Sequence, residues 1–445
     1  MENAMVTKRR RLEHQQSLTD GSSFPMEDLP ERLQVQVLCQ ETGKNSGHGI
    51  LIYALMAAKT GPTDKDSVKV ERAMFVETGD SIIQQHSGIW LNKFSIRCNL
   101  RKDSDILDRW ICFATASKAK VIDMNLWASR NRVRPAKDIY SFPLETFGAQ
   151  DRPFIQYLFL TNVSKPHSDM CGFTKLRSLH LHCVQIIGDL SGLLLNCSSL
   201  VDLEVIECLG MVGLDIPHQL NKLRHLLISN TSIQMLELHV PVLSHFGYKG
   251  TTIPIVLHGC SKLQKATLSF AQTWREEDKN KILGHMHTLT PRATSIFMNL
   301  RHMTYEVLIF TRVPNSHSAI LQLAQYLAFA PQLETFELHM LYQVADDDDD
   351  HLWHGEAASY PMPRHDHLKT VYMSGFRCYR PQVELLCCIL EMGAALENVI
   401  IEPMMKIPFN FDLINLCIPE KICEWAHRTS QRFGKAITIV QPHDR

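Results

Sequence analysis

An alternation of apolar and polar residues recurs along the middle of the chain. In each copy, an apolar residue is followed by two variable positions, a second apolar residue, one variable position and a third apolar residue. The clearest copies are LRSLHLHC at Leu176–Cys183, LVDLEVIEC at Leu200–Cys208 and LRHLLISN at Leu223–Asn230. Such alternation is typical of a strand with one buried face. Each copy therefore predicts a short strand, followed by a turn at the closing Cys or Asn.

The spacing of the copies predicts a repeat architecture. The copies at Leu176, Leu200 and Leu223 begin 24 and 23 residues apart, which lies within the window of leucine-rich repeats. One longer interval, from Leu263 to Leu300, spans 37 residues and leaves room for a helix between strands. Looser copies extend the array on both sides, beginning at Leu91, Val121, Ile155, Leu243, Leu263, Leu300, Leu333, Leu368 and Leu396.

Several segments between the strands carry apolar residues at three- and four-residue steps, the period of a helix. They are Ile106–Ala116, Ile320–Ala330 and Gln382–Gly393, the last closing on a glycine as helix C-termini often do. Strands joined by helices run parallel, and repeats that cannot bury their own apolar face stack into a solenoid. We therefore predict an α/β leucine-rich-repeat solenoid, with a doubly wound α/β domain as the alternative. The expected solenoid core contains Leu179, Leu181, Leu203, Val205, Leu226 and Ile228.

Two stretches interrupt the repeats. Val344–His367 holds five consecutive aspartates, which repel one another and predict a solvated acidic loop. Residues 41–88 lack the repeat phrase, and their apolar run Ile50–Ala58 is too short to span a bilayer, so it predicts a buried helix. We expect a disordered basic leader at 1–23, a separate region at 24–88, the solenoid at 89–343, the acidic loop at 344–366 and C-terminal repeats at 367–445.

Composition and charge narrow the classes of partner and compartment. Of 445 residues, 45% are hydrophobic and 21% are charged, as in globular proteins. The net charge of −1 gives no overall attraction to nucleic acid or membrane, and neither is expected as a partner. The 13 cysteines lie mostly in apolar runs and no apolar leader is visible, which favours a reducing compartment, nucleus or cytoplasm. The basic run at residues 8–11 is either a nuclear-import signal or a solvated tail.

Candidate chemistry is sparse. Histidines cluster near the aspartate run, at His351, His354, His365 and His367, but without the spacing of a metal site. His180 and His182 share one strand face, opposite Leu179 and Leu181, and are expected to contact a partner. Cys387 and Cys388 lie among leucines of a predicted helix and are expected to pack.

The chain contains no GxSxG, Walker A, GxGxxG or HExxH motif. We therefore expect no catalytic residue, no cofactor and no metal, and a protein that is not an enzyme. A hydrolase or transferase on an α/β scaffold is the disfavoured alternative.

Two further segments resemble plant F-box proteins of the leucine-rich-repeat/FBD type. Leu29-Pro30-Glu31, followed by Leu33, Val37 and Leu38, is similar to the opening of the F-box, with apolar residues on one face of a helix. Residues 367–403 resemble the FBD module, in which a strand, the helix ELLCCIL and the strand LENVIIEP follow one another. The F-box similarity ends near residue 40, because residues 41–89 contain no tryptophan and GKNSGHG replaces the expected continuation.

The resemblance implies a substrate-recognition adaptor of an SCF-type cullin-RING ubiquitin ligase. In that family the F-box binds the Skp subunit, and the repeats bind a target protein. Carried over to this sequence, the Skp-binding residues are Leu29, Pro30, Leu33, Val37 and Leu38, within a degenerate F-box-like region at 24–88. Because the F-box is incomplete, the alternative is a repeat-only protein-binding module that recruits no ligase.

Overall fold

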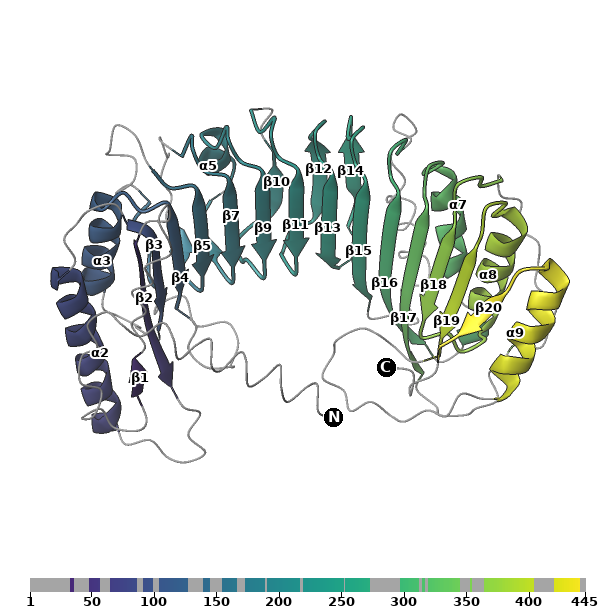
Figure 1. The fold of residues 1–445 in the computed structure, drawn as a ribbon, viewed down its shortest axis with the longest axis horizontal. Coiled ribbons are helices and arrows are strands. Elements are labelled where there is room, and N and C mark those ends of the chain that lie inside the picture. The colour runs from purple at the N-terminus through teal and green to yellow at the C-terminus, as the bar shows by residue number, and fades with distance from the viewer. Residues whose placement is uncertain are drawn as a thin grey trace.

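The protein is an arc of side-by-side strands, with most of its helices at the two ends (Figure 1). The fold is taken from a computed structural model. It describes residues 33–35, 48–56, 65–85, 91–98, 104–126, 139–144, 154–165, 173–188, 190–216, 219–251, 253–272, 297–311, 314–316, 319–344, 353, 364–403 and 420–440.

One sheet of 15 strands runs the length of the arc, and every neighbouring pair in it is parallel except the first. This sheet confirms the predicted α/β solenoid, because each copy of the repeat phrase supplies one strand. In spatial order the strands are β1 (Leu33–Val35), β2 (His48–Met56), β3 (Leu91–Arg97), β4 (Val121–Asn125), β5 (Tyr157–Thr161), β7 (Ser178–His182), β9 (Asp202–Ile206), β11 (His225–Ser229), β13 (His245–Gly250), β15 (Lys265–Gln272), β16 (His302–Thr311), β17 (Thr335–Val344), β18 (Thr370–Ser374), β19 (Asn398–Glu402) and β20 (Ile437–Ile439).

The register of the main sheet stacks the apolar residues of successive repeats. Leu203 on β9 is paired with Leu179 on β7 and with Leu226 on β11. Two residues further along, Leu181, Val205 and Ile228 form a second row. All six residues predicted for the solenoid core are at most 2% exposed. Because each repeat is closed by its neighbours, the core is continuous rather than divided among repeats.

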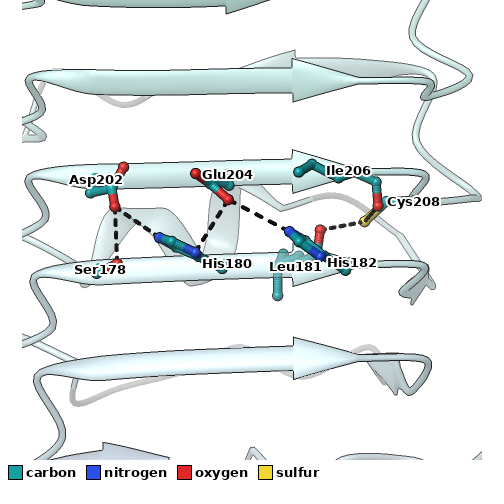
Figure 2. Close-up of polar contacts among 8 residues, drawn as sticks. All are labelled: Ser178, His180, Leu181, His182, Asp202, Glu204, Ile206 and Cys208. Carbon is teal, nitrogen blue, oxygen red and sulfur yellow. Dashed lines mark hydrogen bonds and ion pairs between the residues drawn. The ribbon is translucent and has the colours of Figure 1, made fainter. Parts of the chain in front are cut away.

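The turns after the strands use a left-handed residue. Cys183 and Asn230 have φ values of 51° and 49°, as expected for the residues that close their repeat phrases. In the repeat between them, Glu207 takes this conformation with φ 53°, and the N–H of Glu207 donates to Ser229 O at 2.7 Å. Cys208 follows, and its thiol donates to Leu181 O at 3.3 Å (Figure 2). The ladder of hydrogen bonds therefore continues past the strand ends.

The middle repeats return along a second, smaller sheet instead of a helix. It consists of the parallel strands β10 (Gly213–Asp215), β12 (Met235–His239) and β14 (Ile255–His258). A two-stranded sheet, β6 (Ser164–Lys165) and β8 (Gln185–Ile186), precedes it. Leu236 and Leu238 of β12 are fully buried in the core shared with the main sheet. Repeats of this length have room for a short strand on the return, whereas longer repeats hold a helix.

The helices agree with the predicted positions. The segments predicted at 106–116, 320–330 and 382–393 are confirmed as α3 (Ser104–Ala116), the pair η6 (Ala319–Leu321) and α7 (Gln322–Ala328), and α8 (Arg380–Met392). Gly393 ends α8 with φ −74°, so it does not adopt the left-handed cap. A helix is also expected between the strands that begin near Leu263 and Leu300. Residues 273–296, which would contain it, lie outside the described residues. The other helices in the described residues are α2 (Lys65–Gln85), α5 (Ser191–Leu195), η5 (Pro314–Ser316) and α9 (Glu420–Phe433).

Two helix predictions near the N-terminus are wrong. The apolar run Ile50–Ala58 does not begin a buried helix, because residues 48–56 form β2, which pairs in parallel with β3. The docking helix expected around Leu33 is also absent there, because Leu33–Val35 forms β1, antiparallel to β2. A short apolar run fits a helix or a strand equally well. Here the strand forms because it pairs with the edge of an existing sheet. The sheet therefore extends across the boundary predicted at residue 88.

None of the helices in the described part of the chain combines the length and the apolar character needed to cross a lipid bilayer. The ten described cysteines are all free thiols. The acidic run at Asp346–Asp350, His351, His354 and the basic leader lie outside the described residues.

Candidate recognition face of the main sheet

The outward side chains of the main sheet form a continuous surface, which we call the open face. Alternation along each strand sends every second side chain away from the core. On the central strands the outward residues are Ser178, His180 and His182 on β7; Asp202, Glu204 and Ile206 on β9; His225, Leu227 and Ser229 on β11; His245, Gly247 and Lys249 on β13; and Lys265, Thr267 and Ser269 on β15. The parallel register places them in three rows across the strands.

His180 links two strands on this face (Figure 2). Its Nε2 lies 2.8 Å from Asp202 Oδ2, and its Nδ1 lies 3.2 Å from Glu204 Oε2. The Asp202 carboxylate also accepts a hydrogen bond from Ser178 Oγ at 3.2 Å. Because both ring nitrogens face carboxylates, the imidazolium, which donates from both, fits this arrangement better than the neutral ring.

The electrostatics of the pair agree with this geometry. Burial lowers the pKa of His180, but the hydrogen bond to Asp202 and the charge of Glu204 outweigh it, so the net pKa is raised. For Asp202, burial raises the pKa, but the hydrogen bond and charge of His180 have the opposite and larger effect. The net pKa of Asp202 is therefore lowered. Asp202, His180 and Glu204 thus form a charged chain across β7 and β9.

The two histidines of LHLHC are less exposed than the sequence suggests. The His180 side chain is 20% exposed, and its ring packs edge-on against Phe159 at 4.7 Å between centroids. The His182 side chain is 40% exposed, and its Nε2 lies 3.5 Å from Glu204 Oε2. Both do lie on the open face, as predicted. His180, however, is engaged with its neighbours within the fold, and the Nε2 atom of His182 is buried, so only the exposed part of the His182 ring can reach a partner.

A second cluster of histidines and carboxylate lies on β16 and β17. Glu337 has one oxygen 3.7 Å from His302 Nε2 and the other 3.7 Å from His339 Nε2. The two neighbouring histidines lower the pKa of Glu337, against the opposing effect of burial. His339 Nδ1 is 2.8 Å from Ser374 Oγ on β18. Carboxylates at both flanks of the central strands therefore lie close to histidines of the same face.

Between these clusters the open face is cationic. Strands β11, β13 and β15 have no carboxylate among their outward residues, which include His225, His245, Lys249 and Lys265. His245 has its pKa lowered by burial and by the neighbouring charges of His225 and Lys265. The Leu227 side chain covers Gly247, because a Cβ atom added to this glycine would lie 2.7 Å from Leu227 Cδ1.

Further cations line the edge where these strands begin. Arg177 and Arg224 immediately precede β7 and β11, and Lys222 and Lys262 lie in the turns before β11 and β15; all four are exposed. We call Arg177, Lys222, Arg224, Lys262 and Lys265 the basic edge. In the described part of the chain, none of them forms an ion pair. A surface with unpaired cations is available to an anionic ligand.

Other candidate residues have structural surroundings. His365 is buried, its Nε2 lies 2.9 Å from Ala330 O, and its Nδ1 accepts from Leu368 N–H at 3.2 Å. Burial lowers the pKa of His365, whereas His367 is exposed. Cys387 and Cys388 are buried on α8, and burial raises the pKa of Cys387 to about 11. Such thiols are inert rather than activated.

The residues predicted to bind Skp are mostly outside the described part of the chain. Leu33 is in β1, while Leu29, Pro30, Val37 and Leu38 lie outside the described residues. Sequence reasoning also missed the carboxylates and most histidines of the open face. Their signal was available: they occupy the variable positions inside the repeat phrases, as in DLEVI for Asp202 and Glu204.

Comparison with known proteins agrees with the repeat architecture. A family model described as At1g61320/AtMIF1, LRR domain, matches residues 82–437. No curated protein matches the chain significantly, and neither does any solved structure. The matched stretch begins within α2 and ends at β20, so it takes in nearly the whole main sheet. The chain belongs to the At1g61320/AtMIF1 family of leucine-rich-repeat domains.

Proposed function

We propose that this chain is a protein-binding module that recognises a short acidic segment of its partner through the open face and the basic edge. Leucine-rich-repeat domains are typically interaction modules without catalysis, and the family assignment supports that general role. The observation that carries the finer proposal is the placement of unpaired cations. The five cations of the basic edge lie on or directly before β7, β11 and β15, and the outward positions of these three strands carry no carboxylate.

The size of the basic edge fits a peptide. From β7 to β15 the sheet passes through β9, β11 and β13, which at a strand spacing of about 4.8 Å spans roughly 19 Å. An extended segment of about six residues covers this length.

A protein segment fits better than a nucleic acid. Asp202 and Glu204 on one side and Glu306 and Glu337 on the other place carboxylates on the same face. A uniformly charged phosphate backbone would meet these groups at both flanks, whereas a short acidic segment can place an uncharged residue opposite Asp202 and Glu204 where it crosses β9. The net charge of −1 gives no long-range attraction of the kind on which nucleic-acid binding relies.

A defined probe tests the proposal. We expect a fluorescent ten-residue peptide of alternating Asp and Ser to bind the full chain, with an affinity that falls as salt screens the charges. Reversal of two cations in Lys222→Glu/Arg224→Glu should weaken binding by about tenfold or more. The matched control Lys421→Glu/Arg428→Glu reverses two exposed charges on α9 and should leave binding unchanged.

Three outcomes would contradict the acidic-segment proposal: equal weakening by both double variants, no binding of the acidic peptide, or tighter binding of a ten-nucleotide oligothymidine. A peptide of alternating Lys and Ser serves as the charge control and should not bind.

A finer candidate role is that of substrate adaptor of an SCF-type ubiquitin ligase. The motif Leu29-Pro30-Glu31 favours it, and the strand–helix–strand order expected of an FBD-like module matches β18, α8 and β19. That order is also what any helix-containing repeat produces. The strand at Leu33–Val35 counts against a docking helix at this point. The repeat-only module, which recruits no ligase, is therefore the form we favour.

Skp capture distinguishes the two roles. The full chain, in native form and as Leu33→Asp and Leu51→Asp variants, is incubated with purified Skp. Both substitutions fall on the β1–β2 pair. Absence of capture by the native chain supports the repeat-only module. Capture that both variants abolish establishes the adaptor role, in which case binding depends on these two segments together.

A further inference from the structure

A second group of histidines lies on the outer face of the small sheet, which faces away from the open face. Glu237 and His239 are two residues apart on β12, so their side chains leave the strand on the same side. His258 on β14 is the register partner of His239. The intervening Leu238 is fully buried in the core. The backbone thus brings two imidazoles and one carboxylate together at the surface.

Three potential donor atoms converge there. His258 Nε2 lies 3.0 Å from Glu237 Oε1, and His239 Nε2 lies 3.4 Å from the same oxygen. The two rings are stacked, with 4.3 Å between centroids and 9° between planes. All three ligand atoms lie within 4.8 Å of one another. Around a tetrahedral ion with bonds of about 2.0–2.1 Å, neighbouring ligand atoms are separated by roughly 3.3 Å.

We propose that Glu237, His239 and His258 form a binding site for a divalent transition-metal ion, with zinc as the best-fitting class. Imidazole nitrogens with one carboxylate oxygen are ligands that zinc favours, and three protein ligands leave one position open. The side chains of Glu237, His239 and His258 are 48%, 47% and 35% exposed. The fourth position therefore faces solvent, where water or a side chain of another protein can complete the coordination.

The surroundings favour a cation. Asp215 on β10 is the register partner of Glu237 and is exposed, so two carboxylates stand side by side at this end of the small sheet. Neighbouring like charges on adjacent strands are destabilising, and a bound cation relieves that repulsion.

The cluster around His180 is less suited to a metal ion than the one on β12 and β14. His180, Asp202 and Glu204 also bring three potential ligands together. There, however, a single ring directs its two nitrogens to two different carboxylates, and one metal ion can take only one of those nitrogens. At β12 and β14 the Nε2 atoms of two separate rings lie beside one shared carboxylate oxygen, and a rotation of the two stacked rings would turn both lone pairs toward one metal ion.

Calorimetric titration of the metal-stripped full chain with zinc tests the site. We expect the double variant His239→Asn/His258→Asn to bind one equivalent less than the native chain. The matched control His225→Asn/His245→Asn removes another exposed pair, whose rings lie 4.6 Å apart but nearly perpendicular, and should lose none. Glu237→Gln should weaken the site by at least about 10–100-fold, the range known for lost outer-shell partners.

Cobalt provides an independent readout. Substitution of cobalt for zinc should give the intense visible absorption of a four-coordinate ion in the native chain and in the control, and not in His239→Asn/His258→Asn. Equal zinc stoichiometry in the native chain and that double variant would overturn the proposal. So would loss of the same equivalent from the control, since that would indicate general binding by surface histidines.

Discussion

Replacement of Leu203 by Ala is the most direct test of the stacked core. Leu203 is fully buried, with Leu179 on one side and Leu226 on the other in the same row. Leu→Ala substitutions in cores cost on the order of 2–5 kcal/mol, and more where the surroundings cannot collapse into the cavity. The strands on both sides of Leu203 are held at fixed spacing by their hydrogen bonds. We therefore expect a loss near the upper end, roughly 4 kcal/mol.

Hydrogen exchange measures this loss where it occurs. In a solenoid each repeat contacts only its neighbours, so local opening need not coincide with global unfolding. The amides of β7, β9 and β11 should lose most protection, while those of β17 and β18 should lose less. Urea unfolding followed by circular dichroism gives the accompanying shift in midpoint.

The control is Leu209→Ala, which removes a leucine that is 42% exposed. It should change stability by no more than about 0.5 kcal/mol. The stability loss of the double variant Leu203→Ala/Leu226→Ala should differ from the sum of the losses of the two single variants, because neighbouring core residues are energetically coupled. A Leu203→Ala chain with native protection of β9 would refute the stacked core.

Three further predictions concern single groups. His180→Asn should reduce the free energy of unfolding most below about pH 6.5, because a raised pKa stabilises the folded state only while the ring stays protonated. The difference from the native chain should shrink as pH rises. His245→Asn should show the opposite pH trend, since the pKa of His245 is lowered. Gly375→Ala should reduce stability by more than about 4 kcal/mol, because φ is +70° and a Cβ would lie 1.8 Å from Met340 O. Gly434→Ala, at φ +63° with no atom within 4 Å, should reduce it by roughly 1–2 kcal/mol. Urea midpoints measure both losses. Cys208, buried and with its pKa raised by burial to about 12, should resist iodoacetamide in the native chain, while exposed Cys112 reacts; peptide mass spectrometry would contradict this if both were labelled equally.

The strands of the repeats could be predicted because their signal is local. Alternation with period two is a direct consequence of a half-buried strand, and LRSLHLHC contains the whole of β7. The strands β1 and β2 could not be predicted in this way. An apolar run such as ILIYALMAA fits a helix or a strand, and only its pairing with β3 settles the matter. The small sheet was missed because β10 and β14, with three and four residues, are too short to show an alternation.

The open face was harder to predict because its clusters exist only after the register is fixed. Asp202 lies 22 residues after His180 in sequence, and Glu337 lies 35 residues after His302. Nothing in either repeat alone indicates that these side chains meet. Once neighbouring strands are aligned, however, the variable positions of successive phrases fall beside one another. The alignment of the phrases therefore predicts which polar groups meet, although it does not predict which rotamers they take.

The division between inward and outward rows explains how one chain can change its ligand without losing its fold. Inward residues such as Leu203 contribute to stability through neighbours on both sides, whereas outward residues such as Lys222 and His239 contribute little to packing. The two proposed sites lie on opposite faces of the same repeats, separated by a continuous apolar core. Rigid strands hold each set of side chains at a fixed spacing, so neither site needs to be assembled by the ligand. A substitution in the basic edge should therefore leave metal uptake intact, and a substitution at His239 should leave peptide binding intact.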